Sequence, residues 1–282
     1  MKSFFAGFEK RALVGTAFGA GVGAGGAYAT AKKEMEVSKL REATIEKSPS
    51  LSAFIKKLQP GDVIYSGSVS GDGGEDIAKK LGLKTIPFLG GNLKYHVMLH
   101  TGKGKVVESI RRPEGDKKPD TAEISLSSKF KGMRRGEYTL TAYRPIDADR
   151  ISSNAAVDKA RSLIGGKYPD NKQMFAKAMK TLVGVPGDKS KIDKNDPLVC
   201  QDVAIKAYPN KFGKRHLTSA EMQYNQNFIP VAKAGDYGYD SAERILAESA
   251  YPVAKAFRAG LQGATVGGVT DILRKALKNK RR

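Results

Sequence analysis

Two histidines and one glutamate lie within a single short stretch of the chain, KYHVMLHTGKGKVVES, which covers residues 94–109. The 282 residues contain only three histidines, and two of them, His96 and His100, lie four positions apart here. The TGKG in the middle predicts a hairpin turn, with both histidines on the first strand and Glu108 on the second. Imidazole and carboxylate groups on paired strands are suited to proton transfer. We therefore treat this hairpin as candidate half of an active site.

The length of the hairpin loop decides whether Glu108 faces His96. Side chains alternate between the faces of a strand, so His96, Met98 and His100 share one face. A three-residue loop at 102–104 would place Met98 opposite Glu108 and make His96 its diagonal neighbour, within reach of the carboxylate. A two-residue loop would shift the register and turn Glu108 to the other face. The sequence is compatible with both loop lengths.

The only cysteine of the chain, Cys200, lies in the segment DPLVCQDVAIKAY. Pro197 suits a first helical turn and apolar residues follow at helical spacing, so the pattern predicts a helix that begins at about Leu198. Cys200 would then lie where the helix dipole and a nearby imidazolium favour a thiolate. With His96 as base and Glu108 to orient the ring, a nucleophilic triad would result. The alternative is that Cys200 is a small buried hydrophobic residue.

The charge of the chain is strongly positive. Lysine and arginine total 49 residues against 29 aspartates and glutamates, which gives a net charge of +20. Such an excess favours an anionic partner: an anionic polymer, a membrane surface or, through the basic C-terminal tail, nucleic acid. One cysteine forms neither an internal disulfide nor a zinc cluster, and no ligand spacing predicts a metal or a cofactor.

The elements that must position these residues lie between residues 48 and 234. Strands are predicted at 62–66, 94–100, 105–111 and 137–146. Short helices are predicted before the first strand and at 74–83, and later helices include one capped by Ser153 or Asn154 and the one that carries Cys200. Strands first and helices later favour the α+β class, with an antiparallel sheet covered by helices on one side.

Glycine-patterned helical extensions flank this domain, so three regions are expected: 1–47, 48–234 and 235–282. Residues 12–31 carry no charge, a length that just spans a bilayer, although six of them are glycine. We expect a membrane-associating or self-packing helix there; a cleaved signal peptide and a flexible arm are the alternatives. The C-terminal tail is basic and has its own glycine patch, which suits an anionic membrane, nucleic acid or packing on the main domain.

Five segments occur in an order that resembles the circularly permuted papain-like cysteine hydrolases, a group that includes NlpC-type cell-wall peptidases and lecithin-retinol acyltransferases. They cover roughly residues 55–210 and are LQPGDVIYSG, YHVMLHTGKGKVVES, TAYRP, AVDKARSLIGGKYP and LVCQDVAIKAYP. The resemblance implies a permuted papain-like fold with Cys200 as nucleophile, His96 as base and Glu108 as third residue. Gln201, where many relatives have serine or glutamate, and the long segment 67–93 depart from the family pattern.

These observations favour a cysteine-dependent hydrolase of amide bonds that acts on cell-wall peptide. One alternative is a thiol hydrolase or acyltransferase acting on membrane lipid esters. Another is a non-enzymatic scaffold in a structural or membrane-penetrating assembly, such as a virus particle. Accordingly, we expect a membrane-associated, exported or virion-associated protein. We expect His100 near the turn, at the surface or behind the site, His216 in a loop, and Asp62 in hydrogen bonds at a strand entry.

Overall fold

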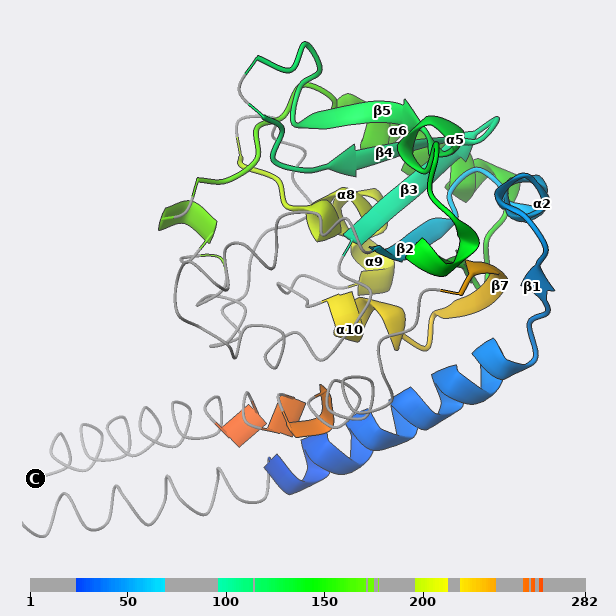
Figure 1. Cartoon of the computed structure of the whole chain (residues 1–282). Helices are drawn as coiled ribbons and strands as arrows, with labels where there is room; N and C mark the ends of the chain where they lie inside the picture. The colour runs from blue at the N-terminus through cyan, green and yellow to red at the C-terminus, as the bar shows by residue number, and fades with distance from the viewer. Residues whose placement is uncertain are drawn as a thin grey trace, which may run out of the picture.

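A computed structural model describes residues 24–68, 96–113, 115–170, 172–174, 177, 196–212, 219–236, 251–253, 255–256 and 259–260. Within these residues the chain is an α+β protein built on one seven-stranded sheet (Figure 1). The strands are β1 (Lys47–Ser48), β2 (Val63–Ser68), β3 (His96–Gly102), β4 (Lys105–Ser109), β5 (Thr121–Ser125), β6 (Tyr138–Pro145) and β7 (Phe228–Gly235). The helices are α2 (Leu51–Lys57), α5 (Leu126–Lys129), α6 (Arg150–Ser162), α8 (Cys200–Ala207), α9 (Pro209–Phe212) and α10 (Ser219–Gln223), with the 3-10 turn η1 (Arg135–Glu137).

The strands lie in the order β1-β7-β6-β2-β3-β4-β5. Every neighbouring pair is antiparallel except β1 and β7, which pair in parallel, so the sheet is mixed. The four predicted strands correspond to β2, β3, β4 and β6 at the centre of this order. β5 extends the sheet on one side of them, and β7 followed by the two-residue β1 extends it on the other; none of these three strands was predicted from the sequence.

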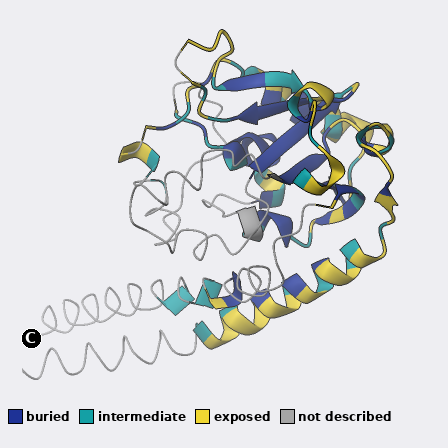
Figure 2. Cartoon of the chain, in the orientation of Figure 1, coloured by how far each residue is buried: buried dark blue, intermediate teal, exposed yellow. Residues whose placement is uncertain are grey.

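Helices cover both faces of the sheet, so the expectation of a sheet covered on one side is wrong. Val97 and Leu99 of β3 pack into one core with residues of α6 and α8. Met98, which lies between them and points the other way, packs with Phe54 of α2 and Leu126 of α5. Figure 2 shows the central strands as the buried interior between these layers. The prediction missed α5 because four residues are too few for a helical pattern.

Both long helices of the domain begin at residues other than the expected ones. α6 begins at Arg150 and its cap is Asp149, not Ser153 or Asn154, because the Asp149 carboxylate accepts a hydrogen bond from the Ser152 backbone N–H at 2.6 Å. α8 begins at Cys200, and Pro197 lies before the helix rather than in its first turn. The start is shifted because the backbone N–H and carbonyl of Leu198 bond to other segments of the chain.

A helix over residues 24–43 lies against the domain next to the C-terminal segment (Figure 1). Its residues Ala31 and Met35 form a small buried cluster with Tyr224 and Tyr251. Near its end, the Glu42 carboxylate accepts hydrogen bonds from two buried side chains, the Tyr143 hydroxyl and the Gln223 amide. In the described part of the chain, no helix combines the length and the apolar character needed to span a bilayer.

Several sequence predictions fall on residues outside those that the structure describes. They are the uncharged segment before residue 24, the helix at 74–83, His216 and the basic tail after residue 260. These four stay predictions from the sequence.

Candidate active site

The turn between β3 and β4 is shorter than the loop that would bring Glu108 to His96 in a regular hairpin. It consists of Lys103 and Gly104, whose φ angles are 50° and 69°. Positive φ angles at both central positions are typical of tight two-residue hairpin turns, and glycine adopts them without strain. In a regular hairpin, this turn would place Glu108 on the face opposite His96.

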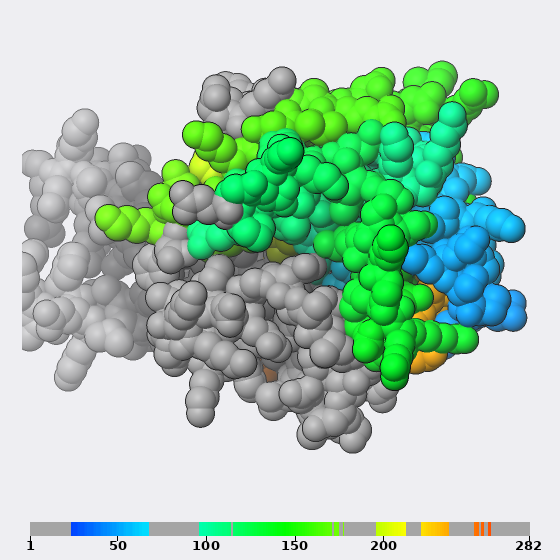
Figure 3. Space-filling model, turned by 45° about the horizontal axis from the view of Figure 1, so that its top comes forward, coloured from blue at the N-terminus to red at the C-terminus, as the bar shows by residue number. Residues whose placement is uncertain are grey.

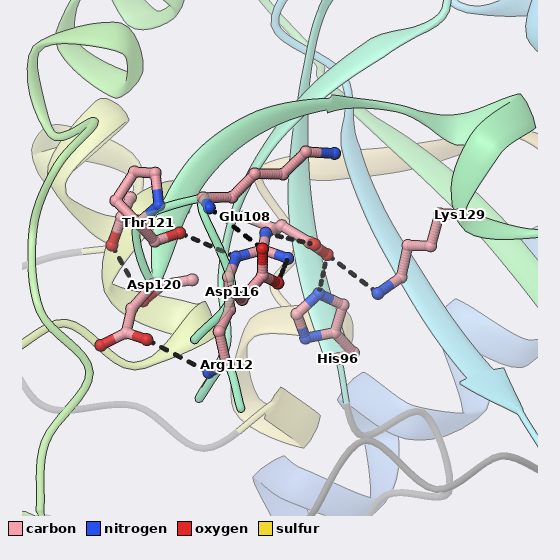
Figure 4. Close-up of polar contacts among 10 residues, drawn as sticks. His96, Glu108, Arg112, Asp116, Asp120, Thr121 and Lys129 are labelled. Carbon is pink, nitrogen blue, oxygen red and sulfur yellow. Dashed lines mark hydrogen bonds and ion pairs between the residues drawn. The ribbon is translucent and has the colours of Figure 1, made fainter. Parts of the chain in front are cut away.

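A β-bulge next to the turn restores the pairing that the site needs. The register of the two strands shifts by one residue between His100 and Gly102, which leaves Thr101 as an extra residue in β3. Beyond the bulge the strands pair as they would after a three-residue loop, and Glu108 lies on the same face as His96. The His96 Nε2 and Glu108 Oε2 atoms are 2.8 Å apart (Figure 4).

Three side chains hold the carboxylate of Glu108, which is 1% exposed. Oε2 accepts from His96 and also lies 2.9 Å from the Lys129 Nζ at the end of α5. Oε1 lies 3.4 Å from Nη2 of Arg112, in the loop after β4. Figure 4 shows these groups converging on the carboxylate from different elements. The segment with α5 lies beside the residues of α2 on the face seen in Figure 3, and this packing sets the position of Lys129.

The ionisation of this buried pair follows from its neighbours. Burial and the charge of Lys129 lower the pKa of His96, but hydrogen bonds to Cys200 and Glu108 and the charge of Cys200 outweigh them and raise this pKa to about 9. Burial raises the pKa of Glu108, whereas the hydrogen bond and charge of His96 and the Lys129 ammonium lower it to about 2. At neutral pH, His96 and Glu108 are therefore an imidazolium–carboxylate ion pair.

Helix α8 brings Cys200 to the other side of the imidazole. α8 packs across β3 and β4, and Cys200, its first residue, is 7% exposed. Cys200 is a side-chain hydrogen-bond partner of His96, and its thiol donates a hydrogen bond to Oε1 of Gln201 at 3.3 Å. Because Nε2 of the ring is bonded to Glu108, Nδ1 is the nitrogen that remains for the thiol. The three predicted residues thus form one hydrogen-bonded series.

The residues before Cys200 are tied to the strand that carries Glu108. Ser109 Oγ donates a hydrogen bond to the Leu198 carbonyl at 2.7 Å, and the Leu198 N–H donates to the Lys167 carbonyl at 2.8 Å. These bonds use the backbone of Leu198 outside any helix, which explains why α8 begins two residues later than expected. They also fix the distance between the cysteine and the histidine–glutamate pair, since Ser109 directly follows Glu108.

A buried aspartate caps the start of α8. The Asp202 carboxylate accepts from the Val199 N–H at 3.1 Å and lies 2.7 Å from Nζ of Lys177. Asp202 is 1% exposed, so the lysine compensates a charge that has no access to solvent. Because this bond occupies the Val199 amide, that amide is not a donor for a substrate. An acidic residue three positions after the cap is the sequence signal that identifies this role.

Tyr65 and Lys129 are two residues of the site that the sequence analysis did not single out. Tyr65 of β2 is 1% exposed, and burial together with the neighbouring Cys200 raises its pKa well above the ordinary value. The phenol therefore stays protonated as a donor beside the thiol. Alternation with Val63 marks Tyr65 as inward-facing, whereas no pattern marks Lys129, because its role arises from a contact between distant segments.

The other two candidates lie at the far end of the same strands. His100 is 2% exposed and its Nδ1 bonds the Gln59 carbonyl at 2.9 Å, so of its two expected positions, at the surface or behind the site, the surface position is wrong. Neither of its ring nitrogens forms a hydrogen bond with the triad. Asp62 accepts from Nε and Nη2 of Arg144 at 2.8 and 2.9 Å and from the Gln59 N–H at 2.8 Å. This hydrogen-bonding role at the strand entry was predicted and is confirmed.

The sequence matches no protein-family model and no curated protein sequence. Among the described residues, no group of histidine, cysteine, aspartate and glutamate side chains has the arrangement of a metal site. The geometry of Cys200, His96 and Glu108 is therefore the feature that bears on function.

Proposed function

We propose that this protein is a cysteine-dependent hydrolase of amide bonds, with Cys200 as nucleophile, His96 as general base and acid, and Glu108 as the residue that orients the ring. One observation carries the proposal: the buried hydrogen-bonded series from Cys200 through His96 to Glu108, assembled from α8, β3 and β4. A thiol next to an imidazole that a carboxylate orients is the arrangement of a nucleophilic triad.

The chemistry proceeds in two steps. The Cys200 thiolate attacks the carbonyl carbon, the C–N bond breaks, and the His96 imidazolium gives its proton to the leaving amine. The acyl group is left as a thioester on the sulfur. Water then attacks this thioester while neutral His96 takes a proton from it, and the acid and the thiolate are released. The position of Cys200 at the start of α8 adds the positive end of the helix dipole, which favours both the thiolate and the oxyanion.

The topology supports placing the chain among the permuted papain-like hydrolases. In the described residues the histidine strand β3 precedes the cysteine helix α8 along the chain, and α8 packs directly on β3 and β4. This is the order that the five sequence segments led us to expect. Gln201 and the long segment 67–93 remain the two features in which the chain departs from that family.

Peptide crosslinks or stem peptides of bacterial cell wall are the substrate that we propose. The triad suits an acyl group of any origin, and a net charge of +20 favours an anionic polymer and an anionic membrane surface alike. The resemblance to a group that includes cell-wall peptidases is what favours the peptide. Esters of membrane lipids would undergo the same chemistry, and the test below separates the two substrates.

The test compares the wild-type protein with Cys200→Ala and Cys200→Ser on purified peptidoglycan and on anionic phospholipid vesicles. We expect new amino termini from peptidoglycan with the wild type and none with either variant. Fatty-acid release from vesicles without new amino termini would move the assignment to lipid esters. Degradation of peptidoglycan by Cys200→Ala at the wild-type rate would show that another residue is the nucleophile. Full biological activity of Cys200→Ser would favour the scaffold hypothesis.

A further inference from the structure

A lysine and the candidate base His96 contact the same oxygen atom of Glu108. Lys129 is the last residue of α5, its side chain is 12% exposed, and its Nζ lies 2.9 Å from Oε2 of Glu108. The same Oε2 lies 2.8 Å from Nε2 of His96. One carboxylate oxygen therefore accepts from two charged donors, and Figure 4 shows both contacts meeting at that atom. A carboxylate whose only task is to orient a histidine does not require this second donor.

We propose that Lys129 is a positioning residue of the candidate triad: it acts through Glu108, fixing Oε2 and limiting how firmly the carboxylate retains the proton on His96. The catalytic meaning of this inference rests on the proposed function, but the contact itself does not. An oxygen that accepts from two cations attracts each less strongly than it would attract one alone.

The formal charges of the groups around His96 show why a second cation is needed. In the reactive state, the thiolate of Cys200, the imidazolium of His96 and the carboxylate of Glu108 together carry one net negative charge. Lys129 brings the buried group to neutrality, and Tyr65 adds no charge because its phenol stays protonated. An uncompensated charge in such a buried site is costly. In a neutral group, the imidazolium can stabilise the thiolate and donate its proton to the leaving amine.

Arg112 is the other cation at this carboxylate, and it is less directed at it. Its Nη2 lies 3.4 Å from Oε1, on the side of Glu108 away from the histidine. Its Nε donates to the Pro119 carbonyl at 2.7 Å, and its Nη1 lies 3.7 Å from Asp116. Part of the Arg112 charge is therefore compensated within its own loop. Lys129 is the cation placed on the atom that bonds the imidazole.

The effect of Lys129 on His96 has a measurable direction. The lysine charge opposes protonation of the ring and is among the causes that lower the pKa of His96. Removing this charge would let the imidazolium persist to higher pH. A like charge within about 4–6 Å shifts a pKa by about one unit or more, which sets the size of the expected change.

The experiment is an NMR titration of the imidazole protons, which three histidines in the chain make simple to assign. The background is Cys200→Ala, so that no thiolate acts on the ring. Lys129→Gln and Lys129→Met each remove the charge, and Lys129→Arg retains it. Lys131→Gln removes the same charge from an exposed residue two positions along. A His96→Gln spectrum identifies the signal.

We expect the His96 midpoint to rise by about one unit in both charge-removing variants and to stay at its reference value in Lys129→Arg and Lys131→Gln. Equal midpoints in Lys129→Gln, Lys129→Met and Lys131→Gln would overturn the inference; so would an equal rise in Lys129→Arg. If one charge-removing variant does not fold, the other decides. Since the titration needs no substrate, it separates a failure of this inference from a failure of the proposed hydrolase activity. In an active protein, the alkaline limb of the rate profile would move in the same direction.

Discussion

Glutamine in place of Glu108 removes one buried charge and keeps the shape of the side chain. In the folded protein this carboxylate is 1% exposed and accepts from His96 and Lys129 at 2.8 and 2.9 Å. Glutamine offers only a neutral oxygen to the same two donors. The variant therefore resembles the wild-type protein with Glu108 protonated, and the two should differ only where the wild-type carboxylate is ionised.

The size of the difference follows from the pKa of Glu108, which falls from 4.5 to about 2 because the ion pairs outweigh burial. A shift of that size corresponds to about 3 kcal/mol of unfolding free energy, at about 1.4 kcal/mol per unit. Because the folded-state pKa is the lower one, this stabilisation is fully present above pH 4.5 and is lost as the pH falls toward 2. Glu108→Gln should thus be about 3 kcal/mol less stable at pH 7 and equal to the wild type near pH 2.

Urea unfolding at several pH values between 2.5 and 7 measures this difference. The control is Glu46→Gln, which removes an exposed carboxylate and should follow the wild-type curve. Parallel curves for the wild type and Glu108→Gln, with a constant gap at every pH, would falsify the assignment of Glu108 as an ionised partner of His96 and Lys129. A gap that opens between pH 2.5 and 4.5 confirms it.

Three further changes test the packing around the site. Iodoacetamide should label Cys200 more slowly in His96→Gln than in the wild type at pH 6, because the imidazole that bonds the sulfur is gone; equal labelling rates would contradict an activated thiol. A Cβ on Gly166 would lie 2.8 Å from Cδ1 of Leu198. Gly166→Ala should therefore lower the free energy of unfolding by about 1–3 kcal/mol, measured by thermal unfolding, and slow the labelling of Cys200. Arg144→Met removes the ion-pair partner of the buried Asp62, so the free energy of unfolding should fall by about 3–5 kcal/mol. Labelling at pH 6 should not change in that variant, and a loss would mean that the two ends of the sheet are coupled.

The alkaline side of the stability curve provides one more expectation. The pKa of His96 is raised from 6.5 to about 9, so the stability that this ring contributes is fully present below pH 6.5 and is lost as the pH rises through 9. His96→Gln should therefore flatten the stability curve between pH 7 and 9.5. Chemical unfolding of both proteins over this range measures it, and a slope unchanged by the substitution would contradict it.

Local patterns were sufficient to predict much of the framework. Alternation and turn residues identified the four central strands, and apolar spacing identified α6 and α8 to within a few residues. These predictions succeeded because each depends on neighbours along the chain. The boundaries failed where distant segments intervene: Leu198 is held by β4 and the loop after α6, which delays the start of α8. α5 and the second covered face were missed for a similar reason, since short elements are stabilised by packing.

What the sequence alone determined is the set of groups available for chemistry: a single cysteine near a helix start, a histidine on a strand and a carboxylate across a hairpin. Only the tertiary structure decided that they meet. The two-residue turn at Lys103 would have turned Glu108 away, and the extra residue Thr101 restores its face. That outcome depends on the register in which β3 and β4 pair. The fold also brings Lys129 of α5 to the Glu108 carboxylate. Pairing energies of this kind arise between residues far apart in the chain, so no local pattern records them.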